Sequence, residues 1–336
     1  MTGVADSFRI SRRAQSSPVI EVDVALSRDR QADLMLLGVT WLAAVSWIFS
    51  KEAVALMAPL AFMAARFLIA GLFLAVLGRR AIGALTWRER RRAVVVGLVF
   101  AAGMSCWIMG LTHGHHLGEG AFLTILGVLL VPVMARLFFG ERPPASTWVA
   151  IPVAVAGLAL LALRHGFRPE VGQVWYVVAA HLFALFYALN TRAANDGPVR
   201  DDTGEVSRLA IAPGALTALN MLTVGVVCTL LSLLLEDARL QGGGVDGRLI
   251  GWVLASALIG SAARFLLQTH AQSLSPHSHG VVILVVEPIW VALLAALWFG
   301  ETMTATQMAG CALIFVALLI SRGAALRDWL GRLLPR

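Results

Sequence analysis

Long apolar runs separated by short polar segments organise almost the whole chain. Ten runs are each about long enough, at about 1.5 Å of rise per helical residue, to cross a hydrocarbon core of about 30 Å. They span residues 32–50, 57–78, 93–112, 117–139, 146–163, 172–191, 213–235, 249–273, 277–299 and 303–321. Since the runs lack the alternation of barrel strands, all are expected to be helices. The pattern predicts an all-α polytopic membrane protein with ten transmembrane helices.

Composition supports this fold class and excludes a soluble globular domain. Of 336 residues, 58% are apolar and only 14% are charged, and the mean hydropathy is +0.78. The polar residues 1–31 predict a disordered cytoplasmic tail. At the other end, residues 322–336 set Leu326, Trp329 and Leu330 against arginines, which predicts a short amphipathic helix on the membrane surface, with a frayed tail as the alternative.

Basic residues predict the orientation in the bilayer. Most of the 27 Lys and Arg side chains fall on the side of both termini, six of them in the 79–92 loop. By the positive-inside rule, both termini are expected in the cytoplasm, with the chain in the inner (plasma) membrane. The high pI of about 10.5 then reflects helix ends facing an anionic leaflet, and no nucleic-acid partner is expected.

An internal repeat appears at an offset of 160 residues. GVLLVPVMARLFFGE (127–141) aligns with EPIWVALLAALWFGE (287–301), and six positions are identical. The chain divides on this basis into two five-helix units, residues 32–163 and 172–321, with an external connection at 164–171. Because five is odd, the second unit is inverted relative to the first, as in many secondary transporters, whose substrate site lies near the midplane.

Several short motifs in this arrangement resemble the EamA-type transporters of the drug/metabolite transporter superfamily. The resemblance covers roughly residues 32–321. It rests on Arg66, on GEGAFLTILGVLLVP (118–132), on Gly140 to Pro143, on Gln268 with Ala271 to Pro276, and on Glu287-Pro288 followed by Gly300-Glu301. It implies a ten-helix secondary transporter, and it alone implies export. The histidines at 113–116 and His181 depart from the family pattern.

Glu287 carries the strongest chemical signal, because it lies ten residues inside the run 277–299. A carboxylate at mid-bilayer costs about 2.5–3.5 kcal/mol unless it faces a cavity or a partner. Pro288 is expected to leave the carbonyl of Leu284 without its helical donor. The residues predicted to bind substrate or couple transport, all expected to face inward, are Glu287, Arg264, Arg66, His181, Gln268, Trp290 and Thr124. A structural salt bridge of Glu287 with Arg264 or Arg66 is the alternative.

One helix face supports a polar path. Ser256, Gly260, Arg264 and Gln268 recur every four residues in the run 249–273, which places them on one stripe of a helix. A stripe of this kind suits a water-filled route. Trp41, Trp47 and Trp107 are interpreted as packing or interface residues at least as readily as site residues.

The two Gly-Glu pairs predict structural caps. Gly140 with Glu141 and Gly300 with Glu301 each lie between two apolar runs. The glycine is expected to permit a tight turn, and the carboxylate is expected near the N-terminus of the following helix. The histidines at 113–116 favour a solvated turn over a metal site, because neighbouring ligands need not converge. No metal and no cofactor are predicted.

These features predict a secondary transporter for small organic solutes such as amino acids or amines, since no nucleotide-binding motif is present. A proton is the candidate coupling ion. Two alternatives stay open: a membrane-embedded enzyme acting on a lipid-linked substrate with Glu287 or His181 as base, and a metal-ion permease. The sequence predicts no oligomeric state.

Overall fold

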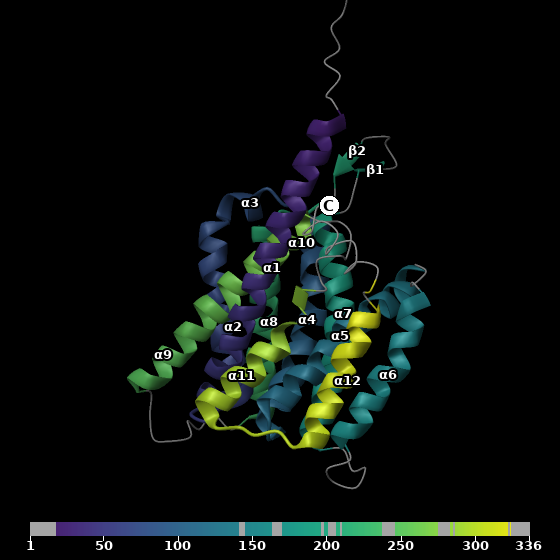
Figure 1. The fold of residues 1–336 in the computed structure, drawn as a ribbon. Coiled ribbons are helices and arrows are strands. Elements are labelled where there is room, and N and C mark those ends of the chain that lie inside the picture. The colour runs from purple at the N-terminus through teal and green to yellow at the C-terminus, as the bar shows by residue number, and fades with distance from the viewer. Residues whose placement is uncertain are drawn as a thin grey trace, which may run out of the picture.

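A computed structural model describes the chain as a bundle of helices (Figure 1). The described residues are 18–140, 145–162, 170–195, 198–200, 206–208, 210–236, 246–274, 283–284, 286–321 and 323. The helices are α1 (Pro18–Val54), α2 (Pro59–Leu77), α3 (Arg79–Gly83), α4 (Trp87–His113), α5 (Leu117–Phe139), α6 (Ala145–Ala162), α7 (Val171–Asn195), α8 (Pro213–Leu235), α9 (Gly247–Ala255), a π-helical segment (Ser256–Ala263), α10 (Arg264–Leu274), α11 (Glu287–Phe299) and α12 (Ala305–Ser321).

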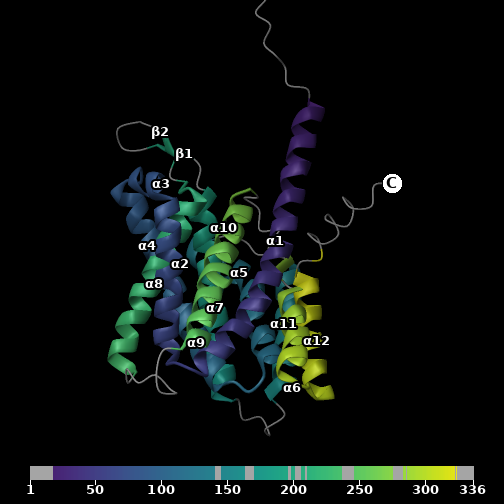
Figure 2. The same ribbon diagram turned by 90° about the vertical axis from the view of Figure 1, so that its left-hand side faces the viewer.

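Two short strands form a hairpin that the sequence did not predict. β1 (Pro198–Arg200) pairs antiparallel with β2 (Val206–Arg208), and Val199 lies opposite Ser207. The hairpin and α3 lie at the end of the bundle from which α1 projects, and the connection from α11 to α12 lies at the opposite end (Figures 1 and 2). We call these the hairpin end and the far end.

Length and composition of the helices are those of a multi-pass membrane protein. Seven helices are long and apolar enough to cross a membrane, and three shorter apolar helices, Trp148–Gly157, Glu287–Phe299 and Ala305–Ala317, accompany them in the described part of the chain. Large apolar side chains point outward, including Leu297 at 83% exposure and Leu234 at 78%. An exposed apolar surface of this kind suits lipid as its surroundings. The predicted class, a membrane protein built from helices, is confirmed.

The N-terminal segment differs from the prediction of a disordered tail over residues 1–31. α1 begins at Pro18, so residues 18–31 are helical, and residues 1–17 lie outside the described part. Proline suits the first turn of a helix, and no glycine or further proline interrupts the sequence until Gly38. Residues 322 and 324–336, where an amphipathic helix was predicted, also lie outside the described residues.

α4 begins at Trp87, before the predicted start at residue 93. The side chain of Thr86 accepts a hydrogen bond from the Glu89 amide, and the Glu89 carboxylate accepts one from the Thr86 amide at 2.7 Å. This capping box satisfies the first amides of the helix and carries it through the basic residues that follow. Hydropathy located only the apolar part of this helix.

Small residues allow α2 and α8 to pack closely. A Cβ atom on Gly71 would lie 2.8 Å from the backbone nitrogen of Leu222, and one on Gly225 would lie 2.8 Å from that of Leu68. Each contact is with backbone, which cannot move without shifting the helix. The crossing therefore depends on both glycines.

Two carboxylates cap helices that belong to the other half of the chain. Glu236 accepts hydrogen bonds from the amides of Leu60 at 2.7 Å and Ala61 at 2.9 Å, at the start of α2. Glu301 accepts one from the amide of Leu117 at 2.9 Å, at the start of α5. Both satisfy donors that a helix N-terminus leaves free.

Glu301 thus caps α5 and not the following helix, near which it was expected, because α12 has its own cap. Thr304 and Gln307 exchange side-chain and backbone hydrogen bonds in a capping box at that position. The preceding Gly300 and the equivalent Gly140 end α11 and α5 with φ of 64° and 69°, the left-handed region that favours glycine. Glu141 lies outside the described residues.

We predict that Gly225→Ala lowers stability, because the added methyl group meets the backbone of α2 and forces the helices apart. The expected loss is about 1–3 kcal/mol, as for overpacked cores. The control is Gly251→Ala, where no atom lies within 4 Å of the added Cβ and a gain in helix propensity is expected. Thermal unfolding of the purified variants in detergent measures both, and equal midpoints would contradict the packing argument.

Candidate functional site

A cavity of about 40 Å³ lies near the middle of the bundle, with room for the centres of about three water molecules. Seven helices contribute to its wall: α1, α2, α4, α5, α7, α10 and α11. The lining residues are Ala43, Ser46, Trp47, Arg66, Phe100, Met104, Trp107, Ala121, Thr124, Ile125, Val128, Phe183, Tyr187, Arg264, Phe265 and Glu287. Residues from both halves of the chain therefore meet at this point.

Glu287 is the first residue of α11 and not an interior residue of a longer helix, as the apolar run predicted. The described residues just before it, Ile283, Leu284 and Val286, have 3₁₀ geometry. Pro288 therefore stands in the first turn of a helix, where no amide donor is required. The sequence predicted that Pro288 would leave the carbonyl of Leu284 without its donor inside a continuous helix. The helix instead begins at Glu287, and hydropathy does not reveal a helix start within an apolar run.

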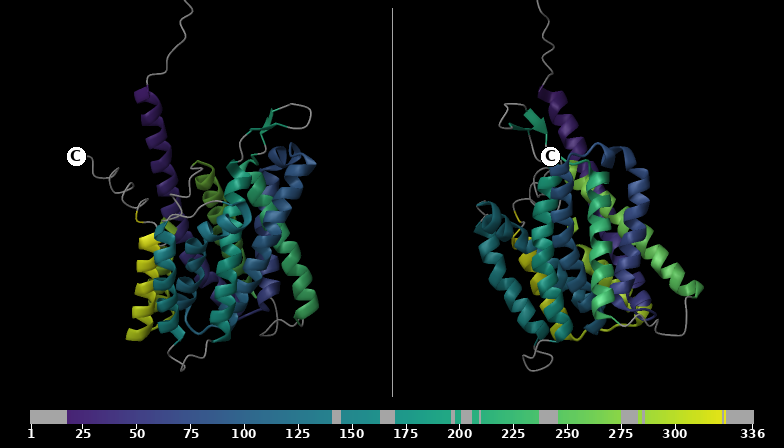
Figure 3. Two further views of the ribbon diagram at one scale, coloured as in Figure 1. Left: turned by 90° about the vertical axis from the view of Figure 1, so that its right-hand side faces the viewer. Right: turned by 180° about the vertical axis from the view of Figure 1, so that it is seen from behind.

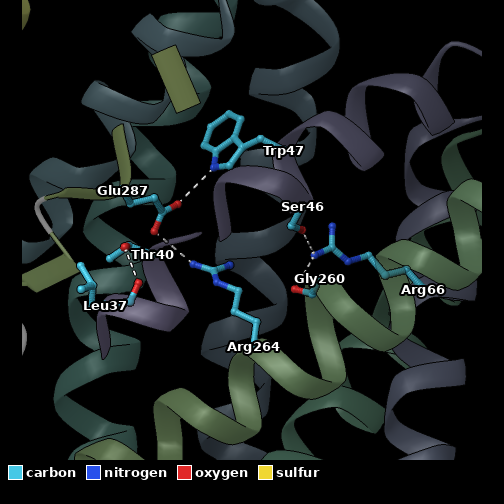
Figure 4. A network of polar contacts seen from close by, with 8 residues as sticks. All are labelled: Leu37, Thr40, Ser46, Trp47, Arg66, Gly260, Arg264 and Glu287. Atoms are coloured by element: carbon cyan, nitrogen blue, oxygen red, sulfur yellow. Dashed lines mark hydrogen bonds and ion pairs between the residues drawn. The ribbon is translucent and has the colours of Figure 1, made fainter. Parts of the chain in front are cut away.

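The carboxylate of Glu287 is held by side chains from two other helices (Figure 4). Its Oε1 accepts a hydrogen bond from Nε1 of Trp47 at 3.1 Å, and its Oε2 lies 3.4 Å from Nη2 of Arg264. Both side chains of the ion pair are only slightly exposed. The N-terminus of α11 adds a favourable dipole for the negative charge. The interactions are thus divided between α1, α10 and α11.

Arg264 keeps unused hydrogen-bonding capacity beside this pair. Its Nε is buried and has no hydrogen-bond partner in the described part of the protein. The guanidinium also lies 4.5 Å from the ring centroid of Phe265, within cation–π range. A single long contact to Glu287 at 3.4 Å leaves the cation able to engage a second acceptor at the cavity.

Arg66 is the other cation of the wall, and only 1% of it is exposed. Its guanidinium donates to the hydroxyl of Ser46 at 2.7 Å and to the carbonyl of Gly260 at 3.1 Å (Figure 4). It also donates to the hydroxyls of Ser50 at 2.8 Å and Ser261. Within the described residues it makes no ion pair. Neutral oxygens therefore solvate this charge.

The π-helical segment explains part of this arrangement. Both Gly260 and Ser261 lie in it, and both contact Arg66. A Cβ atom on Gly260 would lie 2.5 Å from the hydroxyl oxygen of Ser46, so glycine leaves the space that this approach requires. Single π-helical turns are frequently found at functional sites. The regular four-residue periodicity read from the sequence contained no sign of this segment.

The remaining predicted site residues divide into two groups. Thr124 lines the cavity, although its hydroxyl donates to the carbonyl of Gly120 in its own helix at 2.8 Å. Gln268 and Trp290 are not among the lining residues. Gln268 is 1% exposed, and Trp290 packs edge-on against Trp41 with ring centroids 5.4 Å apart.

His181 does not point inward, which corrects the prediction that all mid-depth ionisable residues face the interior. It is exposed on α7, and its Nδ1 lies 2.8 Å from the carbonyl oxygen of Val177. The contact with its own helix gives one ring nitrogen a polar partner, so the side chain does not need one from the cavity. The position of His181 on the outer face removes it from the chemistry of the cavity.

The aromatic residues were the main omission. Trp47 contacts Glu287 directly and stacks edge-on with Trp107 at 4.8 Å between ring centroids. Phe100, Phe183 and Tyr187 complete an aromatic wall. The sequence offered no signal to separate these rings from ordinary packing residues, because an apolar run contains aromatics on every face.

The end of α4 and the turn to α5 carry the histidines at 113–116. His113 is exposed, with Nδ1 2.9 Å from the carbonyl oxygen of Met109. Among the described residues, no three His, Cys, Asp or Glu side chains converge as a metal ion would require.

Comparison with known proteins identifies the class to which this bundle and its cavity belong. The sequence profile of the EamA-like transporter family matches residues 30–163 and again residues 172–323. The chain belongs to this family and carries its repeat twice, so the resemblance drawn from the sequence is confirmed.

Two individual matches agree with this assignment. An uncharacterized transporter of Archaeoglobus fulgidus is 24% identical over 194 residues, 58% of this chain and 62% of that protein, so the alignment spans less than two thirds of the relative. A solved crystal structure of a protein is 18% identical and superposes with a TM-score of 0.58, covering 91% of this chain and 99% of the other. This likeness shows the fold.

We predict that Arg66→Lys destabilises the protein. A lysine ammonium cannot reproduce the planar fork that reaches three hydroxyls and a carbonyl, so at least one buried oxygen loses its donor at a cost of about 1–3 kcal/mol. The matched control is Arg248→Lys, where an exposed arginine pairs with Glu52 and little change is expected. Thermal unfolding in detergent compares the two, and an unchanged midpoint for Arg66→Lys would show that its hydrogen bonds are dispensable.

Proposed function

We propose that this protein is a secondary transporter that exports small organic solutes, such as amino acids or amines, across the inner membrane by alternating access at the central cavity. The observation that carries the proposal is the pair of Arg264 and Glu287, held at the N-terminus of a helix that begins at the cavity. Helices that begin in mid-bundle at a polar site are typical of secondary transporters.

The charges of the cavity wall favour a solute with both an anionic and a cationic group. Arg66 and Arg264 contribute two positive charges, and Glu287 contributes one negative charge. A carboxylate of the solute would face the arginines, and an amine would face Glu287. The aromatic rings of Trp47 and Trp107 supply apolar surface for the rest of the molecule.

The pairing of the helices supports an inverted arrangement of the two halves, and such an arrangement would permit alternating access. Equivalent helices of the two halves pack on each other. The second helices, α2 and α8, are in contact, and the fifth helices, α6 and α12, pack together at one edge of the bundle (Figure 3). The contact of α4 with α7 is matched by that of α10 with α1. α1 begins at the hairpin end, whereas α7 ends there. We therefore propose five-helix repeats over residues 32–163 and 172–321, inverted about the external connection at 164–171.

Glu287 is proposed as the carboxylate that binds substrate or couples transport to a proton. Protonation of Glu287, or its occupation by an amine, would weaken the ion pair and release Arg264 towards the anionic group of the solute. A ligand that binds one arrangement of this pair better than the other shifts the population of conformations. The small volume of the cavity implies that helices at one end must separate before a solute enters.

We predict that Glu287→Gln abolishes gradient-driven transport while folding stays nearly intact, because glutamine keeps the shape and removes the charge. A thermal-shift screen of the purified protein against amino acids, amines, nucleosides and metal salts identifies the solute. Transport of that radiolabelled compound into proteoliposomes under an imposed proton gradient then measures the variant, with a loss of at least about tenfold expected.

The control for this experiment is Glu52→Gln, which removes a carboxylate that pairs with the exposed Arg248 near the C-terminal end of α1 and does not line the cavity. Its transport should match that of the unmodified protein. Full activity of Glu287→Gln would show that the charge is dispensable. A variant that fails to fold, but folds when combined with Arg264→Gln, would make Glu287 a structural partner of the arginine and overturn the proposed role.

The hairpin end is proposed to face the cytoplasm, together with both termini. Exposed arginines of the 79–92 segment lie at this end, which follows the positive-inside rule.

We predict that the thiol introduced by Ala84→Cys, in a background without Cys106, Cys228 and Cys311, is not labelled by an impermeant maleimide applied to intact cells. His113→Cys at the far end should be labelled under the same conditions. Both positions are exposed in the structure, so access to the reagent depends on the side of the membrane alone. The reverse pattern would invert the proposed orientation.

A further inference from the structure

A network of buried amides joins α7, α8 and α10 between the cavity and the hairpin end. Nδ2 of Asn190 donates to Oε1 of Gln272 at 2.8 Å, and Nδ2 of Asn220 donates to Oδ1 of Asn190 at 3.0 Å. Asn195, the last residue of α7, donates to the backbone carbonyl of Gln272 at 2.9 Å. Asn190, Asn220 and Gln272 are almost fully buried. A neutral network of this kind can separate at a lower electrostatic cost than a buried ion pair.

Unpartnered polar atoms connect this network with the cavity. Nε of Arg264, Oε1 of Gln268 and Nε2 of Gln272 are all buried and have no hydrogen-bond partner in the described part of the protein. These residues are four apart on α10, so they share one face and extend about 12 Å along its axis. Oδ1 of Asn220 is a fourth such atom, on the facing helix α8. Polar groups in this condition require water or a polar solute as partner.

A related contact lies at the far end. Nζ of Lys51 lies 3.4 Å from the carbonyl oxygens of Leu111 and Gly114. Lys51 stands in the last turn of α1, as Asn195 stands at the end of α7. Leu111 and Gln272 each lie two residues before the end of the third long helix of their half, α4 or α10. In both halves, a side chain from the first helix therefore binds carbonyl oxygen near the C-terminus of the third.

We infer that these two sets of contacts are the gates of the transport path: the amides of Asn190, Asn220 and Gln272 close it at the hairpin end, and Lys51 closes it at the far end. The face of α10 from Arg264 to Gln272 is the polar route along which the solute passes between cavity and hairpin end. This inference rests on the proposed alternating access, in which one end opens while the other stays closed.

A purely structural role for the same contacts makes a different prediction. Ties that only stabilise the bundle lower its stability when broken and favour neither side of the membrane. Gates change which side reaches the cavity, in opposite directions for the two ends. The decisive measurement is therefore the accessibility of the cavity from each side.

The experiment places a reporter cysteine in the cavity wall by Ala43→Cys, in a full-length background without the native cysteines. An impermeant maleimide is applied either to intact cells or to inside-out vesicles, and labelling of Ala84→Cys identifies the preparation that exposes the hairpin end. Gln272→Met, which removes the side-chain bond to Asn190, should increase labelling of the reporter at least about threefold from the hairpin end only. Lys51→Met should increase it from the far end only.

The matched control is Thr217→Val, which removes a buried hydroxyl on α8 that donates to the carbonyl of Pro213 in its own helix. It should leave both sides unchanged. If Gln272→Met does not fold, Asn190→Ala breaks the same network and carries the same expectation. Equal increases of reporter labelling from both sides, or lower stability without any change in labelling, would refute the assignment of these contacts as gates.

Failure of this inference is distinguishable from failure of the proposed function, because labelling requires no solute. Opposite side preferences for Gln272→Met and Lys51→Met support the gates even if Glu287→Gln transports normally. Transport that depends on Glu287 without side preferences in these variants would leave the function standing and refute the gates.

Discussion

The absence of water from the bilayer core is the constraint on which this structure depends, and the contact of Glu287 with Arg264 and Trp47 is its clearest consequence. A charged group inside a membrane protein needs a protein partner or a polar cavity. The structure provides both. α11 begins at Glu287, so the positive end of the helix dipole and the carboxylate both lie at the cavity, where Trp47 and Arg264 contact the carboxylate. The surrounding helices enclose this small polar centre and separate it from the outer surface of the bundle.

The same requirement joins the two halves of the chain. Glu236 and Glu301, from the second half, satisfy the helix N-termini of α2 and α5 in the first half. Arg66, from the first half, is bound by Ser261 and Gly260 of the second. Polar groups that would be costly alone are thus paired across the repeat boundary, and each half depends on the other for its hydrogen bonds. Coupling of the halves at these points fits a mechanism in which they move as packed units.

Much of the fold was accessible from the sequence, since an apolar run long enough to cross a bilayer leaves its backbone few alternatives to a helix. The runs at 117–139 and 213–235 coincide with α5 and α8 to the residue. The repeat and the short motifs led to the correct family. The predicted helix boundaries were wrong where a local capping motif sets the helix end. The capping box at Thr86 was visible in the sequence as Thr-x-x-Glu, but the polar residues after it hid the start of α4 from a reading based on hydropathy.

The sequence by itself determined which segments are long apolar helices and that Glu287, Arg66 and Arg264 are costly to bury in an apolar environment, because both properties follow from residue type and length of run. Only the tertiary structure decided that Trp47, 240 positions away, meets Glu287, that Glu301 caps α5, and that His181 faces outward. The physical reason is that lipid and protein interior are similarly apolar. In a membrane helix, hydrophobicity therefore does not distinguish the face that packs on neighbours from the face that meets lipid, and the inward residues are fixed by packing between helices.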